Sequence, residues 1–338
     1  MQYKYLGKTG IQISNLCFGT MTFGGEADET TSANLFARCR EAGINLFDCA
    51  NVYHEGRSEE ILGRLIKNCR DKVLITSKVY FPRSKDVNEC GTSRWQIKRA
   101  LEGSLRRLAT DYIDIYFLHR FDENTPLEES LRALNDLVQQ GKIIYLGVSN
   151  FAAWQIVKAL GISAKEQLAS ICCVQPMYNL LKRQAEVEIL PMALSEQVSV
   201  ISYNPLAGGL LTGKYNVTEQ PTEGRLVTNQ MYQVRYGEAH FKQTVSNFVA
   251  LAKAHGFHPA SLAIAWVTSH PAVTAALLGA RNLNQLEDCL RAQEIKLTPE
   301  LRAAISALSP TPPTATDRND ELDKNAELFR LHIAATKK

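Results

Sequence analysis

Short apolar runs alternate with segments of helical spacing along almost the whole chain. The runs are typical of buried parallel strands, and the segments between them repeat apolar residues every three or four positions. We predict strands at residues 16–18, 44–47, 73–77, 113–118, 143–148, 171–175, 199–203 and 273–278. We predict helices at residues 31–42, 58–66, 93–109, 127–140, 151–160, 184–197, 241–255, 259–269 and 283–292. This alternation predicts a parallel α/β sheet, and eight units fit a closed (β/α)8 TIM barrel best.

The remaining segments complete the predicted architecture. Residues 2–14 are expected to form an N-terminal β-hairpin around the turn at 7–10. Long loops at 80–92 and 215–238 follow strands, so they would lie over the C-terminal face of the barrel. Residues 309–338 are predicted to be a linker and tail, with a charged helix at 320–335, within a single domain of residues 1–338. Ser58 is the expected N-cap of the helix at 58–66.

A doubly wound sheet is the main alternative to the barrel. That fold binds dinucleotides through a G-x-G-x-x-G turn, and this motif follows none of the predicted strands. The barrel is therefore the preferred fold.

Composition and charge exclude several classes of function. Of the 338 residues, 45% are apolar and 22% are charged, which is ordinary for a globular protein. The net charge of +3 with scattered basic residues argues against a nucleic-acid or membrane partner. No apolar run is long enough to span a membrane, and the first residues lack a signal-peptide core, so we expect a cytoplasmic protein. Eight cysteines without metal-ligand or CxxC spacing are expected to be free thiols.

Four residues of proton-handling type fall at or just after the ends of three successive predicted strands. Asp48 ends the strand at 44–47, and Tyr53 lies five residues further on. Lys78 follows the strand at 73–77, and His119 follows the strand at 113–118. Because catalytic groups of (β/α)8 barrels gather at the C-terminal ends of the strands, we predict that these four residues meet.

These four side chains make chemical sense together. A tyrosine has an ordinary pKa near ~10, and a nearby Lys78 ammonium is expected to lower the pKa of Tyr53. Asp48 would keep Lys78 charged and oriented, and His119 could donate a hydrogen bond to a substrate oxygen or relay the proton. Such a set suits the protonation of an oxygen while a hydride reaches the attached carbon.

Other catalytic motifs are incomplete. Gly7-Lys8-Thr9 ends like a P-loop but has Gln2 in place of the first glycine. Gly147 to Phe151 has Phe151 where a nucleophile elbow needs glycine. His54-Glu55 begins like a zinc-protease helix, but Ser58 replaces the second histidine, so no metal site is predicted.

A hydride donor needs a binding site, and the later strand ends offer suitable groups. Ser149, Asn150 and Gln175 could bind a planar carboxamide, and the ring of Tyr203 could stack on it. The Gly-rich segment 205–214 ends in a lysine and could wrap a pyrophosphate with backbone N–H groups. Residues 279–282 open a helix after the last strand, where phosphate binding is favoured.

The chain resembles the aldo-keto reductase family from Tyr3 to about Leu308. The resemblance is carried by Asp48 with Tyr53, Lys78, His119, residues 147–151, Val174-Gln175, residues 205–215, and residues 278–282 with Gln285. It implies a barrel that binds NADPH and reduces aldehydes or ketones, with Tyr53 as general acid. On this resemblance the expected cofactor contacts are Gly19, Thr20, Met21, Ser149, Asn150, Gln175, Tyr203, Asn204, Pro205, Leu206, Gly208, Thr212, Gly213, Lys214, Gly279, Arg281, Gln285 and Asp288.

Two places depart from the family pattern. Cys289 stands where many relatives have an asparagine, and it is a poor replacement for an adenine-contacting side chain. His54-Glu55 follow Tyr53 where a glycine is common, which is expected to reshape the rim of the pocket.

We therefore predict an NADPH-dependent carbonyl reductase acting on a small-molecule substrate. Two alternatives stay open. One is a class I aldolase or related lyase in which Lys78 forms a Schiff base. The other is a regulatory barrel with little turnover, like the potassium-channel β subunits that the resembled family also contains. The sequence predicts neither the physiological substrate nor the oligomeric state.

Overall fold

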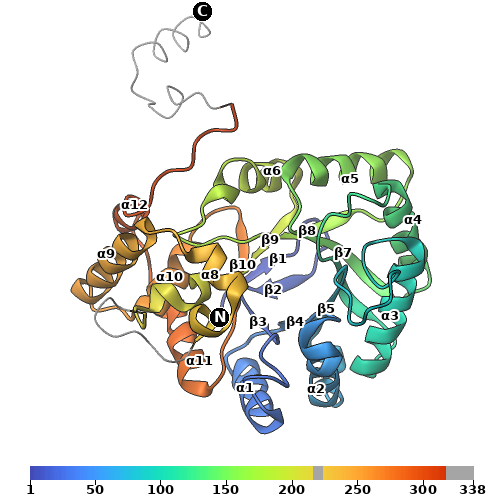
Figure 1. Ribbon diagram of the computed structural model, residues 1–338, viewed down its shortest axis with the longest axis horizontal. Coiled ribbons are helices and arrows are strands. Elements are labelled where there is room, and N and C mark those ends of the chain that lie inside the picture. Colours follow the sequence, from blue (N-terminus) through green and yellow to red (C-terminus); the bar gives the residue numbers. More distant parts are fainter. Residues whose placement is uncertain (216–223, 317–338) are drawn as a thin grey trace, which may run out of the picture.

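The strands of the computed structural model, which describes residues 1–215 and 224–316, close into a parallel barrel (Figure 1). Neighbouring strands are hydrogen-bonded in the order β10-β3-β4-β5-β6-β7-β8-β9, and β10 closes the barrel against β3. The strands are β3 (Leu16–Gly19), β4 (Leu46–Asp48), β5 (Leu74–Val79), β6 (Ile113–Leu118), β7 (Ile143–Ser149), β8 (Ile171–Gln175), β9 (Ser199–Ser202) and β10 (Val273–Leu278). The predicted (β/α)8 barrel is confirmed.

Helices surround the barrel, and all but the short α7 and α8 cover the outer side of its strands (Figure 1). They are α1 (Glu29–Glu41), α2 (Arg57–Ile66), α3 (Arg94–Leu108), α4 (Leu127–Gln139), α5 (Ala153–Lys165), α6 (Ile189–Glu196), α7 (Arg225–Thr228), α8 (Gln230–Tyr236), α9 (His240–Ala254), α10 (Pro259–Thr268), α11 (Leu283–Leu290) and α12 (Pro299–Ser306). Several begin at side-chain caps; the carboxylate of Asp28, for example, accepts a hydrogen bond from the Thr31 N–H at the start of α1.

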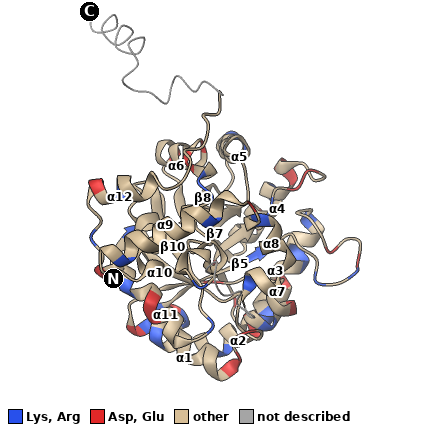
Figure 2. Ribbon diagram, turned by 60° about the vertical axis from the view of Figure 1, so that its left-hand side comes forward, with Lys and Arg blue, Asp and Glu red and all other residues tan. Residues whose placement is uncertain are grey.

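Charged side chains of both signs are interspersed over the outer helices and loops (Figure 2). Most of the buried apolar residues form one large cluster between the strands and these helices. Within the described residues, no helix is long and apolar enough to cross a membrane. The cysteines at the described positions are free, as predicted, and five of the eight are buried.

A second cluster fills the inside of the barrel and is closed at one end by the hairpin of β1 (Tyr3–Tyr5) and β2 (Gln12–Ser14). Leu6 and Ile13 of the hairpin region pack against Leu46, Phe117 and other inward-facing strand residues. The Gly7 N–H also donates to the Ser199 hydroxyl at 2.6 Å, which fixes the hairpin to β9. Because the hairpin seals the N-terminal end of the strands, the opposite end is the open mouth.

Several predicted boundaries differ from the structure. Strand β5 runs to Val79, so Lys78 lies inside the strand rather than after it, whereas β9 ends at Ser202. The predicted helix 184–197 is a short 3₁₀-helix, Gln184–Glu186, followed by α6. The charged helix predicted at 320–335 lies outside the described residues.

Two further expectations were wrong. Ser58 is not a cap: α2 begins at Arg57 after Gly56, and the buried Ser58 hydroxyl donates to the Thr20 carbonyl at 2.7 Å. The segment 215–238 is not simply a loop, because its described part contains α7 and α8. Both errors arise where tertiary packing decides the local structure. Residues 80–92, by contrast, hold no helix or strand, as predicted.

Candidate active site

The four residues of proton-handling type converge at the mouth of the barrel. Asp48 ends β4, Lys78 lies near the end of β5, and His119 follows β6. Tyr53 begins a short 3₁₀-helix, Tyr53–Gly56, after β4. The Lys78 ammonium lies 2.5 Å from the Asp48 carboxylate and 3.4 Å from the Tyr53 hydroxyl, and the rings of Tyr53 and His119 meet edge to face with centroids 6.2 Å apart. The predicted convergence is therefore present.

Asp48 and Lys78 form a buried ion pair, and each side chain also has hydrogen-bond partners outside the pair. Their side chains are 1% and 0% exposed. The Lys78 ammonium also donates to the Cys49 carbonyl at 2.7 Å. The other Asp48 oxygen accepts hydrogen bonds from the Thr76 hydroxyl at 2.7 Å and from the Gln175 amide at 2.8 Å. A buried pair needs such extra bonds to offset the loss of hydration.

The pKa of Tyr53 does not follow the sequence-based expectation. Burial raises the pKa of Tyr53 well above its ordinary value, and the negative charge of Asp48 raises this pKa further. The expected lowering by Lys78 is wrong for the resting site, because Asp48 pairs with the ammonium and desolvation disfavours the phenolate. The Tyr53 phenol therefore keeps its proton at neutral pH and can donate it.

His119 is held in the neutral form. Burial lowers the pKa of His119 well below its ordinary value, and the Lys78 ammonium lowers it further. Its Nδ1 atom is buried without a hydrogen-bond partner in the described structure. The ring also contacts Phe81 edge to face, with centroids 5.0 Å apart. His119 is thus a neutral imidazole fixed beside the Tyr53 hydroxyl.

The residues directly after Tyr53 take an unusual backbone path. His54 and Glu55 have φ of 44° and 58°, in the left-handed region where glycine is the usual residue. A Cβ atom at Gly25 would lie 1.9 Å from the His54 ring, so that glycine makes room for the histidine. Neither His54 nor Glu55 lines the cavity beside Tyr53, so the expected reshaping of the pocket rim does not come from their side chains.

One cavity of about 910 Å³ extends from Tyr53 and His119 to the start of α11. Most of the predicted cofactor contacts line it: Gly19, Met21, Ser149, Asn150, Gln175, Tyr203, Asn204, Pro205, Leu206, Gly208, Thr212, Lys214, Gly279, Arg281, Gln285 and Asp288. Asp48, Tyr53 and His119 line it as well, whereas the fully buried Lys78 does not. This volume is within the range of sites that enclose small molecules and cofactors.

Two predicted contacts, Thr20 and Gly213, do not line the cavity. Thr20 is buried, with its hydroxyl 3.1 Å from the Asp48 carbonyl and 2.9 Å from the Ser58 hydroxyl. Gly213 ends the 3₁₀-helix Ala207–Thr212 with φ of 80° and packs close to Val249. Both residues shape the backbone behind the cavity wall.

A chain of hydrogen bonds links the residues expected to bind a carboxamide. The Tyr203 hydroxyl donates to the Asn150 side-chain oxygen at 2.8 Å, and the Asn150 amide donates to the His119 carbonyl at 2.9 Å. The Asn150 amide also donates to the Ser149 hydroxyl at 3.1 Å, and that hydroxyl donates to the Gln175 carbonyl at 2.9 Å. Since the Gln175 amide nitrogen is bonded to Asp48, this chain connects the Tyr203 ring to the ion pair. It holds the rings and amides at this wall in fixed orientations.

The Gly-rich segment after β9 differs from its predicted use. Gly208 and Gly209 have φ of 68° and 94°, as a tight turn requires. Several of its backbone N–H groups, however, are already bonded locally: those of Ala207, Gly209 and Gly213 donate to the carbonyls of Asn204, Leu206 and Leu210. The Gly208 N–H donates to the Asn204 side chain at 2.7 Å. An anion bound here would thus rely mainly on side chains rather than on a backbone wrap.

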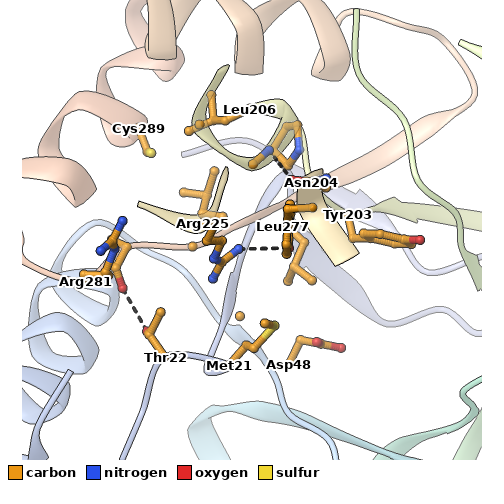
Figure 3. A pocket seen from close by; sticks show the side chains of 18 of the residues that line it. Met21, Thr22, Asp48, Tyr203, Asn204, Leu206, Arg225, Leu277, Arg281 and Cys289 are labelled. Carbon is orange, nitrogen blue, oxygen red and sulfur yellow. Dashed lines mark hydrogen bonds between the residues drawn. The ribbon is translucent and has the colours of Figure 1, made fainter. Parts of the chain in front are cut away.

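Three cations supply the charge for an anion at the α11 end of the cavity. They are Lys214, Arg225 and Arg281, and none of them has a carboxylate partner in the described part of the chain. Burial lowers the pKa of Lys214, and the positive charges of Arg281 and Arg225 lower it further. Figure 3 places Arg281 at one end of the pocket, Asp48 and Tyr203 toward the other, and Arg225 between them.

The sequence did not point to every residue of the cavity. Arg225, Met231, Tyr232 and Arg235 come from α7, α8 and the residues beside them. This segment was predicted as a long loop over the mouth. The prediction gave the location of the segment but not which of its side chains line the cavity. Phe81 and Arg120, next to Tyr80 and His119, were also missed. Cys289 lines the cavity as a buried thiol on α11.

The described residues hold no cluster of three or more histidine, cysteine or acidic side chains that could bind a metal ion.

Comparisons with known proteins agree with this fold. Residues 15–310 match the model of the family described as "Aldo/keto reductase family". The chain is 38% identical to an uncharacterized oxidoreductase, YrpG, of Bacillus subtilis over 92% of this chain and 97% of the relative. It is 35% identical to a probable voltage-gated potassium channel subunit beta of Oryza sativa over 94% of this chain and 99% of that relative. A putative potassium channel subunit beta of Schizosaccharomyces pombe is 34% identical over 90% of this chain and 92% of its own length.

A parallel eight-stranded barrel with Asp, Tyr, Lys and His gathered at its mouth defines a class of barrel oxidoreductases. The chain belongs to the aldo/keto reductase family, and the sequence-based resemblance is confirmed.

Proposed function

We propose that this protein reduces aldehydes or ketones to alcohols with NADPH as the cofactor. The observation that carries the proposal is the Tyr53 hydroxyl, which lies 3.4 Å from the Lys78 ammonium on the wall of a cavity. Lys214 and Arg281 offer positive charge toward the start of α11, and Arg225 lies between the two ends of the same cavity. A proton donor at one end and a phosphate-binding end opposite suit an oxidoreductase that uses a phosphorylated dinucleotide.

The residues of the cavity fit this cofactor. The Tyr203 ring offers a face for the nicotinamide, and Ser149, Asn150 and Gln175 lie beside it to bind the carboxamide. Lys214 and Arg225 would meet the pyrophosphate, and Arg281 would meet the 2′-phosphate that distinguishes NADPH from NADH. When bound, the nicotinamide supplies the hydride for the reduction.

The protein's own groups handle the proton. The protonated Tyr53 phenol donates to the substrate carbonyl oxygen and transfers its proton as negative charge develops there. The Lys78 ammonium, held by Asp48, stabilises the phenolate that forms. The neutral His119 ring beside Tyr53 orients the substrate oxygen. Phe81 and Tyr232 limit the access of water around it.

A Schiff-base lyase is less consistent with the site. A nucleophilic lysine must reach its substrate and lose its proton. The Lys78 side chain is fully buried, and its ammonium is bonded to the Asp48 carboxylate and the Cys49 carbonyl. These contacts favour a charged lysine that acts through Tyr53.

A regulatory barrel that binds cofactor with little turnover is the second candidate function. Its support is the similarity to proteins named as potassium channel β subunits. The relative named as an oxidoreductase and the complete set of Asp48, Tyr53, Lys78 and His119 favour a working enzyme.

Two measurements on the wild-type protein decide between these functions. Fluorescence titration with NADPH and NADH should give tighter binding of NADPH. The absorbance of NADPH should then fall with members of an aldehyde and ketone panel, at a turnover of about 1 s⁻¹ or more for good substrates. Tight cofactor binding without turnover on any carbonyl compound would support the regulatory candidate. Failure to bind either nucleotide would contradict both candidate functions.

A further inference from the structure

Two arginines that line the cavity have no part in the function proposed above. Arg120 directly follows His119, and Arg235 lies on α8; both line the cavity together with Tyr53 and His119. They come from segments far apart in the sequence, the end of β6 and the segment after β9. The proposed function gives the cofactor phosphates to Lys214, Arg225 and Arg281 and leaves these two arginines unassigned.

Neither arginine has an ionic partner among residues 1–215 and 224–316. No hydrogen bond or salt bridge joins either guanidinium to another described residue, and their near contacts are aromatic rings. The guanidinium carbon of Arg120 lies 5.8 Å from the centre of the Tyr80 ring, and that of Arg235 lies 5.4 Å from the centre of the Tyr232 ring. Other arginines on the outer helices are paired: Arg38 with Glu287, Arg64 with Glu29, and Arg132 with Glu166.

The carboxylates that line the cavity do not balance these charges. They are Asp48, which is bonded to Lys78, and Asp288, which lies 3.7 Å from both His258 and Arg291. Five basic side chains line the same cavity: Arg120, Lys214, Arg225, Arg235 and Arg281. The proposed function assigns Lys214, Arg225 and Arg281 to the cofactor phosphates, so the charges of Arg120 and Arg235 are left without an assigned anion.

Tyr232 is contacted by two arginines: the guanidinium carbons of Arg225 and Arg235 each lie 5.4 Å from the centre of its ring. Burial raises the pKa of Tyr203, and the positive charge of Arg235 acts in the opposite direction, so Arg235 lies on the side of the cavity where the Tyr203 hydroxyl donates to Asn150. The Arg235 side chain is half-buried beside Tyr232, where an unpaired cation loses part of its hydration.

We propose that the carbonyl substrate carries an anionic group, a carboxylate or a phosphate ester, which Arg235 binds with the help of Arg120. This inference rests on the proposed reduction and specifies its substrate class. A planar guanidinium can donate two parallel hydrogen bonds to either oxyanion. Apolar walls from Phe81, Met231 and Tyr232 reduce the competition from water and strengthen this attraction.

The test compares matched aldehydes that differ in charge. The 2-, 3- and 4-carboxybenzaldehydes are assayed against their uncharged methyl esters, and 4-formylphenyl phosphate is assayed against 4-methoxybenzaldehyde. The wild type should show the higher kcat/KM for at least one anion of these pairs, mainly through a lower KM. The pair with the larger ratio distinguishes a carboxylate from a phosphate.

Variants then assign the preference to the two arginines. Arg235→Met should lower the anion-to-neutral ratio of kcat/KM about tenfold to a hundredfold, as expected for the loss of a charge-assisted hydrogen bond. Arg235→Lys should recover part of the ratio, and Arg120→Met should lower it less because Arg120 is more exposed. Arg132→Met on α4, far from the cavity lining, should keep the wild-type ratio.

Binding without turnover separates this inference from the proposed reduction. Calorimetry measures the binding of the corresponding benzoates and of phenyl phosphate to the protein saturated with NADP⁺. If neither aldehyde class is reduced, the proposed function fails, and weaker anion binding in Arg235→Met than in wild type still supports the site. The inference is overturned if the wild type prefers the neutral aldehydes, if the variants keep the wild-type ratio and anion affinity, or if Arg235→Met weakens NADPH to the same extent.

Discussion

At the residue scale, the buried pair of Asp48 and Lys78 decides what Tyr53 can do. The pair keeps a full positive charge 3.4 Å from the phenol without exposing it to solvent. Burial and Asp48 raise the pKa of Tyr53 in the resting site, so the phenol retains its proton until a substrate oxygen accepts it. Burial removes the hydration of both charges, so each charge depends on its partner to offset that loss.

Removing one member of the pair should therefore destabilise the fold. We expect Asp48→Asn to lower the free energy of unfolding by about 3–5 kcal/mol, because it leaves the Lys78 ammonium buried without a counter-charge. The double variant Asp48→Asn with Lys78→Met should lose less than the sum of the two single changes, since neither charge is then left alone. Urea unfolding of the four proteins measures the coupling, and strict additivity would contradict the buried pair.

His119 makes a prediction for stability against pH. Its folded pKa is lowered by burial and by Lys78, while the unfolded chain binds a proton near the ordinary value of 6.5. The contribution of neutral His119 to the free energy of unfolding is thus complete above pH 6.5. It is lost as the pH falls from 6.5 toward the pKa of His119 in the folded protein. His119→Gln should flatten the slope of unfolding free energy below pH 6.5 by up to about 1.4 kcal/mol per pH unit.

Burial also lowers the pKa of His270. Because His270 is present in both wild type and His119→Gln, a difference between their slopes comes from His119. Equal slopes for wild type and His119→Gln between pH 4.5 and 6.5 would show that His119 is not held neutral.

At the scale of elements, the segment after β9 builds most of one cavity wall. The 3₁₀-helix Ala207–Thr212 turns through Gly208, where a Cβ atom would lie 2.7 Å from the Tyr232 ring, so α8 packs directly over this turn. The short α7 and α8 bring Arg225, Tyr232 and Arg235 to the cavity. The start of α11 brings Arg281 from the other side, with its N–H donating to the Gln285 side chain at 3.1 Å.

This arrangement predicts which cation distinguishes the two nicotinamide cofactors. Arg281→Ala should weaken NADPH binding about tenfold to a hundredfold by removing a charge-assisted hydrogen bond to the 2′-phosphate. It should change NADH binding little. Lys214→Met is the matched control. Lys214 is assigned to the pyrophosphate, which both cofactors contain, so its removal should weaken the binding of NADPH and NADH alike. Fluorescence titration of both cofactors decides, and equal losses in Arg281→Ala would refute its assignment.

At the scale of the whole molecule, the barrel was predictable because its signals are local and repeated. Eight apolar runs alternating with helices define the fold, and Asp48, Tyr53, Lys78 and His119 follow from their positions near strand ends. The pKa of Tyr53 was not predictable, because it depends on how deeply the phenol and Asp48 are buried. The packing of α8 over Gly208 was also missed, since the helix is short and is held by tertiary contacts. Ser58 shows the same limit, because its hydroxyl serves Thr20 rather than a helix end.

The most direct test of the account is the turnover of Tyr53→Phe on a good aldehyde substrate, measured from the absorbance of NADPH at saturating cofactor. The change removes only the hydroxyl that is proposed to donate the proton. Turnover should fall about a hundredfold or more, while the Kd for NADPH stays at the wild-type value. Tyr80→Phe, which removes a phenol that does not line the cavity, should keep wild-type turnover. Near-normal turnover by Tyr53→Phe would contradict the central claim that Tyr53 is the general acid.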